Sequence, residues 1–219
     1  MCGRYSRSRY AVDYVEPLMT DTGRYDPADF RPSWNIAPGT RQPVIRPYGA
    51  QLEHWGYRPA WAVARGVPQM INARLDKAGS SAWKSLWTKG RAIVPADGWY
   101  EWAMEAGKKQ PYYIRAVDGA PLYFAGLTSV KLSEEAREGD GYVIVTAAAD
   151  GGLVDVHDRR PVALTADDAR AWLSPETSLE EATHIANNLA LPATAFECYP
   201  VSRAVGKVGN DEPSLNDPI

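Results

Sequence analysis

The chemistry that this chain could carry out begins at its second residue. Only Cys2 and Cys198 are cysteines among the 219 residues. If Met1 is removed, Cys2 presents an α-amine and a thiol on adjacent carbons. Such a 1,2-aminothiol condenses with an aldehyde to an imine, and the thiol then closes a five-membered thiazolidine. The amine titrates at about 7.7–8.0 and the thiol at about 8.5, so both can act near neutral pH. The plain alternative is a small buried cysteine with no chemical role.

Two other residues have side chains suited to proton transfer. Glu101 lies among Trp99, Tyr100 and Trp102 in the sequence, and apolar surroundings raise the pKa of a carboxyl group toward neutral pH. His157 is one of three histidines and stands in a polar, turn-like stretch. Its imidazole is expected to titrate near pH 6.5. A surface-strand glutamate and a solvated loop histidine are the alternatives without catalysis.

Short motifs along the chain resemble, in order and approximate spacing, those of one family. They are MCGRY at 1–5, WNIAPG at 34–39, WGYRPAW at 55–61, INAR at 71–74, GWYEW at 98–102, YFAGL at 123–127, HDRRP at 157–161 and YPVS at 199–202. The set resembles the SOS-response-associated peptidase (SRAP) family, the abasic-site processing proteins, from Met1 to about Asn210. Each motif alone is weakly specific, and the ordered set with cysteine at position 2 is strongly specific.

The resemblance implies a β-rich SRAP fold that binds single-stranded DNA and forms a crosslink from Cys2 to the ring-opened sugar of an abasic site. It assigns sugar ring opening to Glu101. It assigns help with the imine, strand cleavage by β-elimination and crosslink reversal to His157. It matches Asn72 with the family's active-site asparagine, whose amide would hold the Cys2 amine or the sugar hydroxyls. A turn or capping asparagine is the alternative for Asn72.

Arginine and aromatic residues within these motifs are the candidate DNA contacts. Guanidinium groups bind phosphate through two parallel hydrogen bonds, which suggests Arg4, Arg74 and Arg159. Surface ion pairs are the alternative role for these three. Bases stack on aromatic rings or are held apart by a wedge, which suggests Pro38, Trp61 and Trp102.

The sequence departs from the family pattern at four positions. Asp76 and Lys77 stand where glutamate and threonine are usual, Arg160 where methionine is usual, and Gly39 where threonine is usual. The four candidate catalytic residues are unaffected. The departures therefore bear on how a strand docks rather than on the reaction.

Two other functions remain open from the sequence. An N-terminal-nucleophile peptidase would use the Cys2 thiol, with its own amine or His157 as the base, although no oxyanion motif is evident. A non-covalent single-stranded DNA-binding module would use the basic first half and the aromatic motifs. It would leave Glu101 and His157 without a role. We rank both below the abasic-site enzyme.

Composition indicates a globular protein in a reducing compartment. The hydrophobic share is 45% and the charged share 23%, and the net charge of −3 combines +6 over residues 1–110 with −9 over 111–219. A basic half can supply a phosphate-binding face. Two distant cysteines make no disulfide framework, and no apolar run approaches the roughly 18 residues of a membrane span. We predict a cytoplasmic monomer, associated with the nucleoid if bacterial, that works with single-stranded DNA and the replication machinery. We predict no metal and no organic cofactor, since no His/Cys spacing resembles a zinc site.

The elements that must position these residues form one α+β domain over 1–219. We expect a central antiparallel or mixed sheet or a partial barrel, peripheral helices, and a loop-like tail from about residue 206. Apolar, β-branched runs predict strands at 43–46, 91–95, 111–116, 121–126 and 141–147. Helical patterns and caps predict helices at 11–19, 76–88, 165–173 and 177–190.

Overall fold

Strands form most of the body of the chain. The computed structural model describes residues 2–19, 24–132, 134–151, 153 and 156–219. Its strands are β1 (Tyr5–Arg7), β2 (Ser33–Ile36), β3 (Arg41–Arg46), β4 (Gly49–His54), β5 (Asn72–Arg74), β6 (Arg91–Ala96), β7 (Gly98–Glu105), β8 (Lys108–Ala116), β9 (Leu122–Thr128), β10 (Tyr142–Ala148), β11 (Arg159–Pro161), β12 (Ala163–Leu164) and β13 (Phe196–Pro200).

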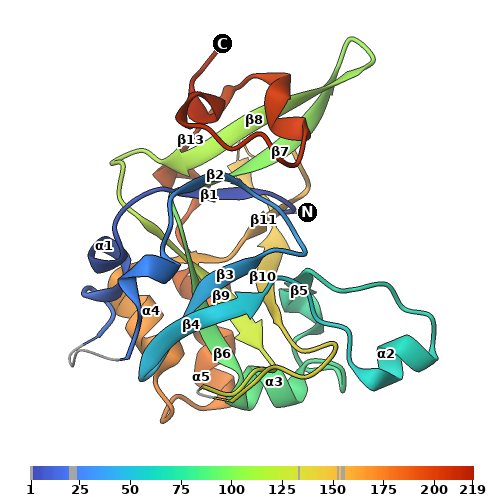
Figure 1. Cartoon of the computed structure of the whole chain (residues 1–219), viewed down its shortest axis with the longest axis vertical. Helices are drawn as coiled ribbons and strands as arrows, with labels where there is room; N and C mark the ends of the chain where they lie inside the picture. Colours follow the sequence, from blue (N-terminus) through green and yellow to red (C-terminus); the bar gives the residue numbers. More distant parts are fainter. Residues whose placement is uncertain (1, 20–23, 133, 152, 154–155) are drawn as a thin grey trace.

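The strands build two open sheets, which confirms the predicted β-rich α+β fold without a closed barrel (Figure 1). The smaller sheet has the order β13-β8-β7-β1-β2. The larger follows β11-β10-β9-β6-β3-β4, with β12 beside β9 and β5 beside β10. Among the described pairs within these sheets, β5 with β10 is parallel and the others are antiparallel.

The helices are short and lie around the sheets (Figure 1). They are α1 (Ala11–Val15), α2 (Ala60–Ala64), α3 (Lys84–Lys89), α4 (Ala166–Leu173) and α5 (Leu179–His184), with short 3-10 turns between. The cap of α4 is as predicted, since Thr165 accepts from the amide of Asp168. The capping box of α5 joins Ser178 and Glu181, one residue later than the predicted box of Thr177 and Glu180. None of the described helices is long and apolar enough to cross a membrane.

The predicted helix over 76–88 is wrong. A 3-10 turn at Leu75–Lys77 and the helix α3 replace it, and turns fill the segment between them. Glycine and serine favour turns over helix interiors, and Gly79, Ser80 and Ser81 lie at this break. The predicted helix over 11–19 likewise ends at Val15, and the one over 177–190 becomes a π-helical turn from Ile185.

Aromatic side chains pack against Cys2 in the smaller of two large cores. This cluster contains the fully buried rings of Tyr5, Trp55, Trp99 and Tyr142. The rings of Tyr5 and Trp55 meet edge to face at 5.1 Å, and those of Trp55 and Tyr142 stack at 6.2 Å. Cys2 therefore lies in rigid, water-poor surroundings.

The tail beyond residue 203 packs against the smaller sheet. It forms 3-10 turns at Arg203–Gly206 and Pro213–Asn216, which lie over β7 and β8 in Figure 1. Val205 and Leu215 are buried there against Tyr100 and Tyr113. The tail is built from these short turns, and it covers one face of β7.

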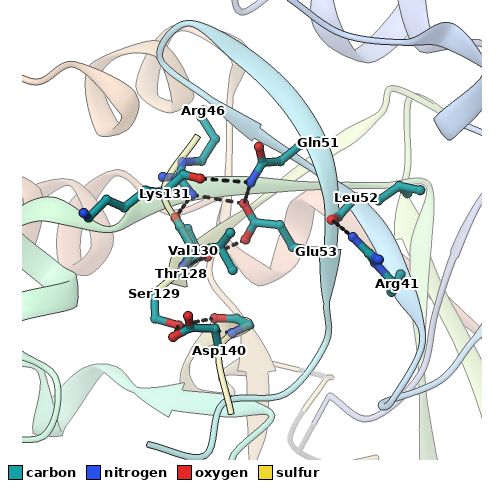
Figure 2. Close-up of polar contacts among 11 residues, drawn as sticks. Arg41, Arg46, Gln51, Leu52, Glu53, Thr128, Ser129, Val130, Lys131 and Asp140 are labelled. Carbon is teal, nitrogen blue, oxygen red and sulfur yellow. Dashed lines mark hydrogen bonds and ion pairs between the residues drawn. The ribbon is translucent and has the colours of Figure 1, made fainter. Parts of the chain in front are cut away.

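A buried ion pair ties the edge of the larger sheet to the segment after β9 (Figure 2). Arg46 Nη1 donates to Glu53 Oε1 at 3.0 Å and to the Val130 carbonyl at 2.5 Å. The Thr128 hydroxyl donates to the other Glu53 oxygen, and Gln51 Nε2 donates to Oε1 at 3.3 Å. Glu53 is only 1% exposed, so these donors replace the water that its carboxylate has lost.

Candidate active site

The register between β1 and β7 brings Cys2 to Glu101. Tyr5 lies opposite Trp99, and the Arg4 carbonyl accepts from the Tyr100 amide at 2.9 Å. Because the two strands run antiparallel, residues before Tyr5 lie alongside residues after Trp99. Both side chains are buried, Cys2 fully and Glu101 at 3% exposed.

Strand β10 positions the other two candidate residues. The parallel strand β5 places Asn72 opposite Ile144, and β11 places Arg159 opposite Ala148. His157 lies just before β11. Asn72 Nδ2 donates to the Cys2 carbonyl at 3.0 Å, and His157 Nε2 lies 3.9 Å from Glu101 Oε2. The fold therefore brings together all four residues predicted to be catalytic.

Burial dominates the electrostatics of this cluster. It raises the pKa of Glu101 to about 7, so the carboxyl group holds and releases a proton near neutral pH. It raises the pKa of the Cys2 thiol, and the negative charge of Glu101 adds to this effect. It lowers the pKa of His157 below its usual value. The thiol and the imidazole are therefore mainly neutral at pH 7.

The side-chain oxygen of Asn72 has no donor among the described residues. Asn72 Oδ1 is buried, and no hydrogen-bond partner lies within range of it in the described part of the chain. A buried amide oxygen without a donor costs about 1–3 kcal/mol. The described residues hold no group of three or more His, Cys, Asp or Glu side chains that could bind a metal ion.

The three candidate phosphate contacts differ in exposure. The Arg74 side chain is 54% exposed and meets Asp76 through two hydrogen bonds of 3.0 and 2.7 Å. Arg159 is 12% exposed and donates to Thr146 Oγ1 at 3.0 Å. Its Nη1 also lies 4.0 Å from Asp76 Oδ1. The guanidinium groups of Arg74 and Arg159 therefore flank one carboxylate.

Arg4 lies inside the protein, with 8% of the residue exposed. Its Nη1 donates to Asn35 Oδ1 at 2.6 Å and to the Val205 carbonyl at 2.9 Å. The guanidinium also lies 6.0 Å from the Trp102 ring centre. These contacts join the N-terminal segment to the tail, and a phosphate contact by Arg4 stays a prediction.

The candidate stacking residues lie on separate elements. Trp61 on α2 is 38% exposed, and the Arg65 guanidinium lies 5.9 Å from its ring centre. Trp102 on β7 and Pro38 after β2 are half-buried. The described contacts do not bring these three together, and their role with bases stays a prediction.

Sequence reasoning missed three polar partners of this site. Asn35 holds Arg4, Asp76 pairs with Arg74, and Asp158 Oδ1 lies 2.8 Å from His157 Nδ1. Asn35 and Asp158 stand inside motifs that the sequence displayed. The contact of Asn35 with Arg4 depends on the fold. Asp158 adjoins His157 and Asp76 lies two residues from Arg74, so these two pairs could have been found from local spacing.

Comparison with known proteins identifies the family. A family model described as SOS response associated peptidase (SRAP) matches residues 1–208. The chain belongs to the SRAP family. A curated relative, the abasic site processing protein YedK of Escherichia coli, is 43% identical over the full length of both chains. The abasic site processing protein HMCES of Gallus gallus is 29% identical, covering all of this chain and 78% of the relative.

A solved structure agrees with this assignment. A phage-related protein from Bordetella bronchiseptica is 40% identical, with a TM-score of 0.78, and the match covers 99% of this chain and all of that one. The SRAP resemblance drawn from the motifs is thereby confirmed, as is the fold that it implied.

Proposed function

We propose that this SRAP protein binds single-stranded DNA at an abasic site and forms a covalent thiazolidine crosslink through Cys2 after Met1 is removed. The observation that carries the proposal is the placement of Cys2 beside a buried carboxyl group whose pKa is about 7. The names of the relatives, which are abasic site processing proteins, support the same substrate.

The site supports a defined order of steps. Glu101 takes a proton from the anomeric hydroxyl and gives one to the ring oxygen, which opens the sugar to an aldehyde. The Cys2 amine adds to the aldehyde carbon, and one water leaves to give the imine. The thiol sulfur then adds to the imine carbon, and the thiol proton ends on nitrogen. Because burial keeps the thiol neutral, the amine reacts first.

Asn72 and the arginines have supporting roles in this proposal. Asn72 Oδ1 accepts a hydrogen bond from the Cys2 amine or a sugar hydroxyl, which supplies its missing donor. Arg74 and Arg159 exchange Asp76 for a backbone phosphate of the strand. The same site would carry out β-elimination and crosslink reversal with His157 as the proton carrier.

The buried thiol argues against the peptidase alternative. A cysteine peptidase needs a thiolate, and burial together with Glu101 disfavours the thiolate of Cys2. A binding module without a covalent step would have no use for a buried carboxyl group poised near pH 7. We therefore keep one candidate function.

The proposal is tested with an oligonucleotide that carries one abasic site, analysed on a denaturing gel. The wild type and the matched control Cys198→Ala are expected to give a heat-stable shifted band. Cys2→Ala is expected to give none. Cys2→Ser keeps an amine and is expected to lose the stable ring. A heat-stable adduct with Cys2→Ala would overturn the mechanism.

A further inference from the structure

His157 lies between two carboxyl groups, one on the surface and one in the interior. Its Nδ1 is 2.8 Å from Asp158 Oδ1, and its Nε2 is 3.9 Å from Glu101 Oε2. The Asp158 side chain is 83% exposed, whereas the Glu101 side chain is 3% exposed. The imidazole therefore connects a solvated carboxylate with the buried carboxyl group of the site.

The two partners of Nδ1 require opposite protonation states of that atom. The backbone amide of Arg159 donates to Nδ1 at 3.0 Å, which needs a lone pair there and puts the proton of the neutral ring on Nε2. The Asp158 carboxylate needs a proton on Nδ1, which leaves the lone pair of the neutral ring on Nε2. Only the second arrangement lets Nε2 take a proton from Glu101.

We propose that Asp158 is a positioning residue that selects the Nδ1–H tautomer of His157, so that Nε2 exchanges a proton with Glu101. One proton moves from Glu101 Oε2 to His157 Nε2 and returns, carried across the 3.9 Å gap by a sugar hydroxyl or a water, while the Nδ1 proton stays on His157 and donates to Asp158. The arrangement follows the logic of a catalytic triad, with a carboxyl group in place of the nucleophile. This role rests on the proposed function for its use in ring opening.

The charged groups around the imidazole affect the protonation of His157 in opposite directions. Burial and the amino-terminal positive charge lower the pKa of His157, the negative charge of Asp158 acts to raise it, and the charge of Arg159 lowers it by less. Glu101 faces the ring from β7, and Arg74 and Asp76 lie near Arg159. Once Met1 is removed, the Cys2 amine joins this set. Among these groups, Asp158 is placed to hold a proton on Nδ1.

The first test reads the tautomer directly. In the full chain labelled with ¹⁵N-histidine, the ring nitrogen shifts of three histidines are recorded across the pH range, and His157→Gln identifies the signal. The wild type is expected to show Nδ1–H at His157, Asp158→Asn to show Nε2–H, and Asp158→Glu to restore Nδ1–H. An Nε2–H wild type, or no change in Asp158→Asn, would overturn the proposal.

The second test measures the pH profile of adduct formation. Asp158→Asn is expected to lower the rate about 2- to 5-fold near neutral pH, the size usual for an interaction with an exposed charge, and to change the profile. Asp158→Glu is expected to restore the wild-type profile. The matched control Asp150→Asn removes a neighbouring carboxylate that pairs with Arg160, and it is expected to leave the His157 signal and the profile unchanged.

The two tests separate the two ideas. A wild type that forms no adduct contradicts the proposed function, and the tautomer measurement still decides the role of Asp158. A wild type that forms the adduct, with the same tautomer and profile in Asp158→Asn, contradicts the role of Asp158 alone.

Discussion

The two buried glutamates Glu53 and Glu101 have different neighbours and, in our account, different roles. Glu53 is 1% exposed and Glu101 is 3% exposed, and burial raises the pKa of both. Glu53 accepts from a guanidinium, an amide and a hydroxyl (Figure 2). Glu101 lies beside a cysteine and a histidine. Donors that keep their protons at every ordinary pH make a buried carboxylate structural, whereas neighbours that can lose or gain protons make it reactive.

The largest expected effect is on the reaction at Glu101. Glu101→Gln keeps the shape of the side chain and removes its proton transfer. We expect the rate of adduct formation to fall about 10²- to 10⁴-fold, the usual contribution of general acid–base catalysis. Single-turnover gels measure it, with Glu105→Gln on the same strand as the exposed control. A rate within twofold of the wild type would remove Glu101 from the mechanism.

The matching change at Glu53 should affect stability instead. Glu53→Ala leaves the Arg46 guanidinium buried without its carboxylate, and we expect a loss of about 3–5 kcal/mol in the free energy of unfolding. Urea denaturation measures it. Glu134→Ala, which breaks an exposed pair with Lys131, is the control and should cost under about 1 kcal/mol. Folded Glu53→Ala protein should still form the adduct. Loss of the adduct without a loss of stability would contradict the structural role of Glu53.

The pH dependence of stability gives a third contrast. Between the ordinary value of 4.5 and the folded value of about 7, the folded chain binds a proton at Glu101 that the unfolded chain does not. Stability should therefore fall as pH rises through this window and level off above it. The difference in unfolding free energy between Glu101→Gln and wild type should grow by up to about 3 kcal/mol from pH 4.5 to pH 8. Urea denaturation across this pH range measures the difference. A difference between the two proteins that stays constant with pH would contradict the raised pKa of Glu101.

The smallest effect concerns one donor to Glu53. Thr128→Val removes the hydroxyl that bonds the buried carboxylate, and we expect a loss of about 1–2 kcal/mol in unfolding free energy. Thr88→Val, on the exposed surface of α3, should change it by about 0.5 kcal/mol or less. Denaturant titration compares the two. Equal effects would show that the hydroxyl does not stabilise Glu53.

The sequence indicated the long strands and a set of candidate residues that lie together more readily than the contacts among those residues. Strands such as β6 and β10 carry continuous β-branched runs, which the pattern reveals. The short strands β1, β5 and β11 have three residues each, and hydrogen bonds to neighbouring strands hold them in place. These strands position Cys2, Asn72 and Arg159. No local pattern marks a strand that short.

The contacts of individual side chains were also harder to predict than the long strands. Arg4 is a predicted phosphate contact, and the sequence did not show that its guanidinium donates to Asn35 and to the carbonyl of Val205, 201 positions away in the chain. The approach of His157 to Glu101 depends on where the segment before β11 meets β7. Such contacts arise from tertiary packing, and they were out of reach of motif spacing alone.

The central claim is that Cys2 forms a ring with the sugar of an abasic site. Intact mass spectrometry of the purified protein, incubated without reductant with a single-stranded oligonucleotide carrying one abasic site, tests it most directly. The account predicts a species with the mass of the chain without Met1 plus the DNA minus one water, and peptide mapping should place the DNA on Cys2. A chain without Met1 that gives no such species, or one with the DNA on another residue, would contradict the claim.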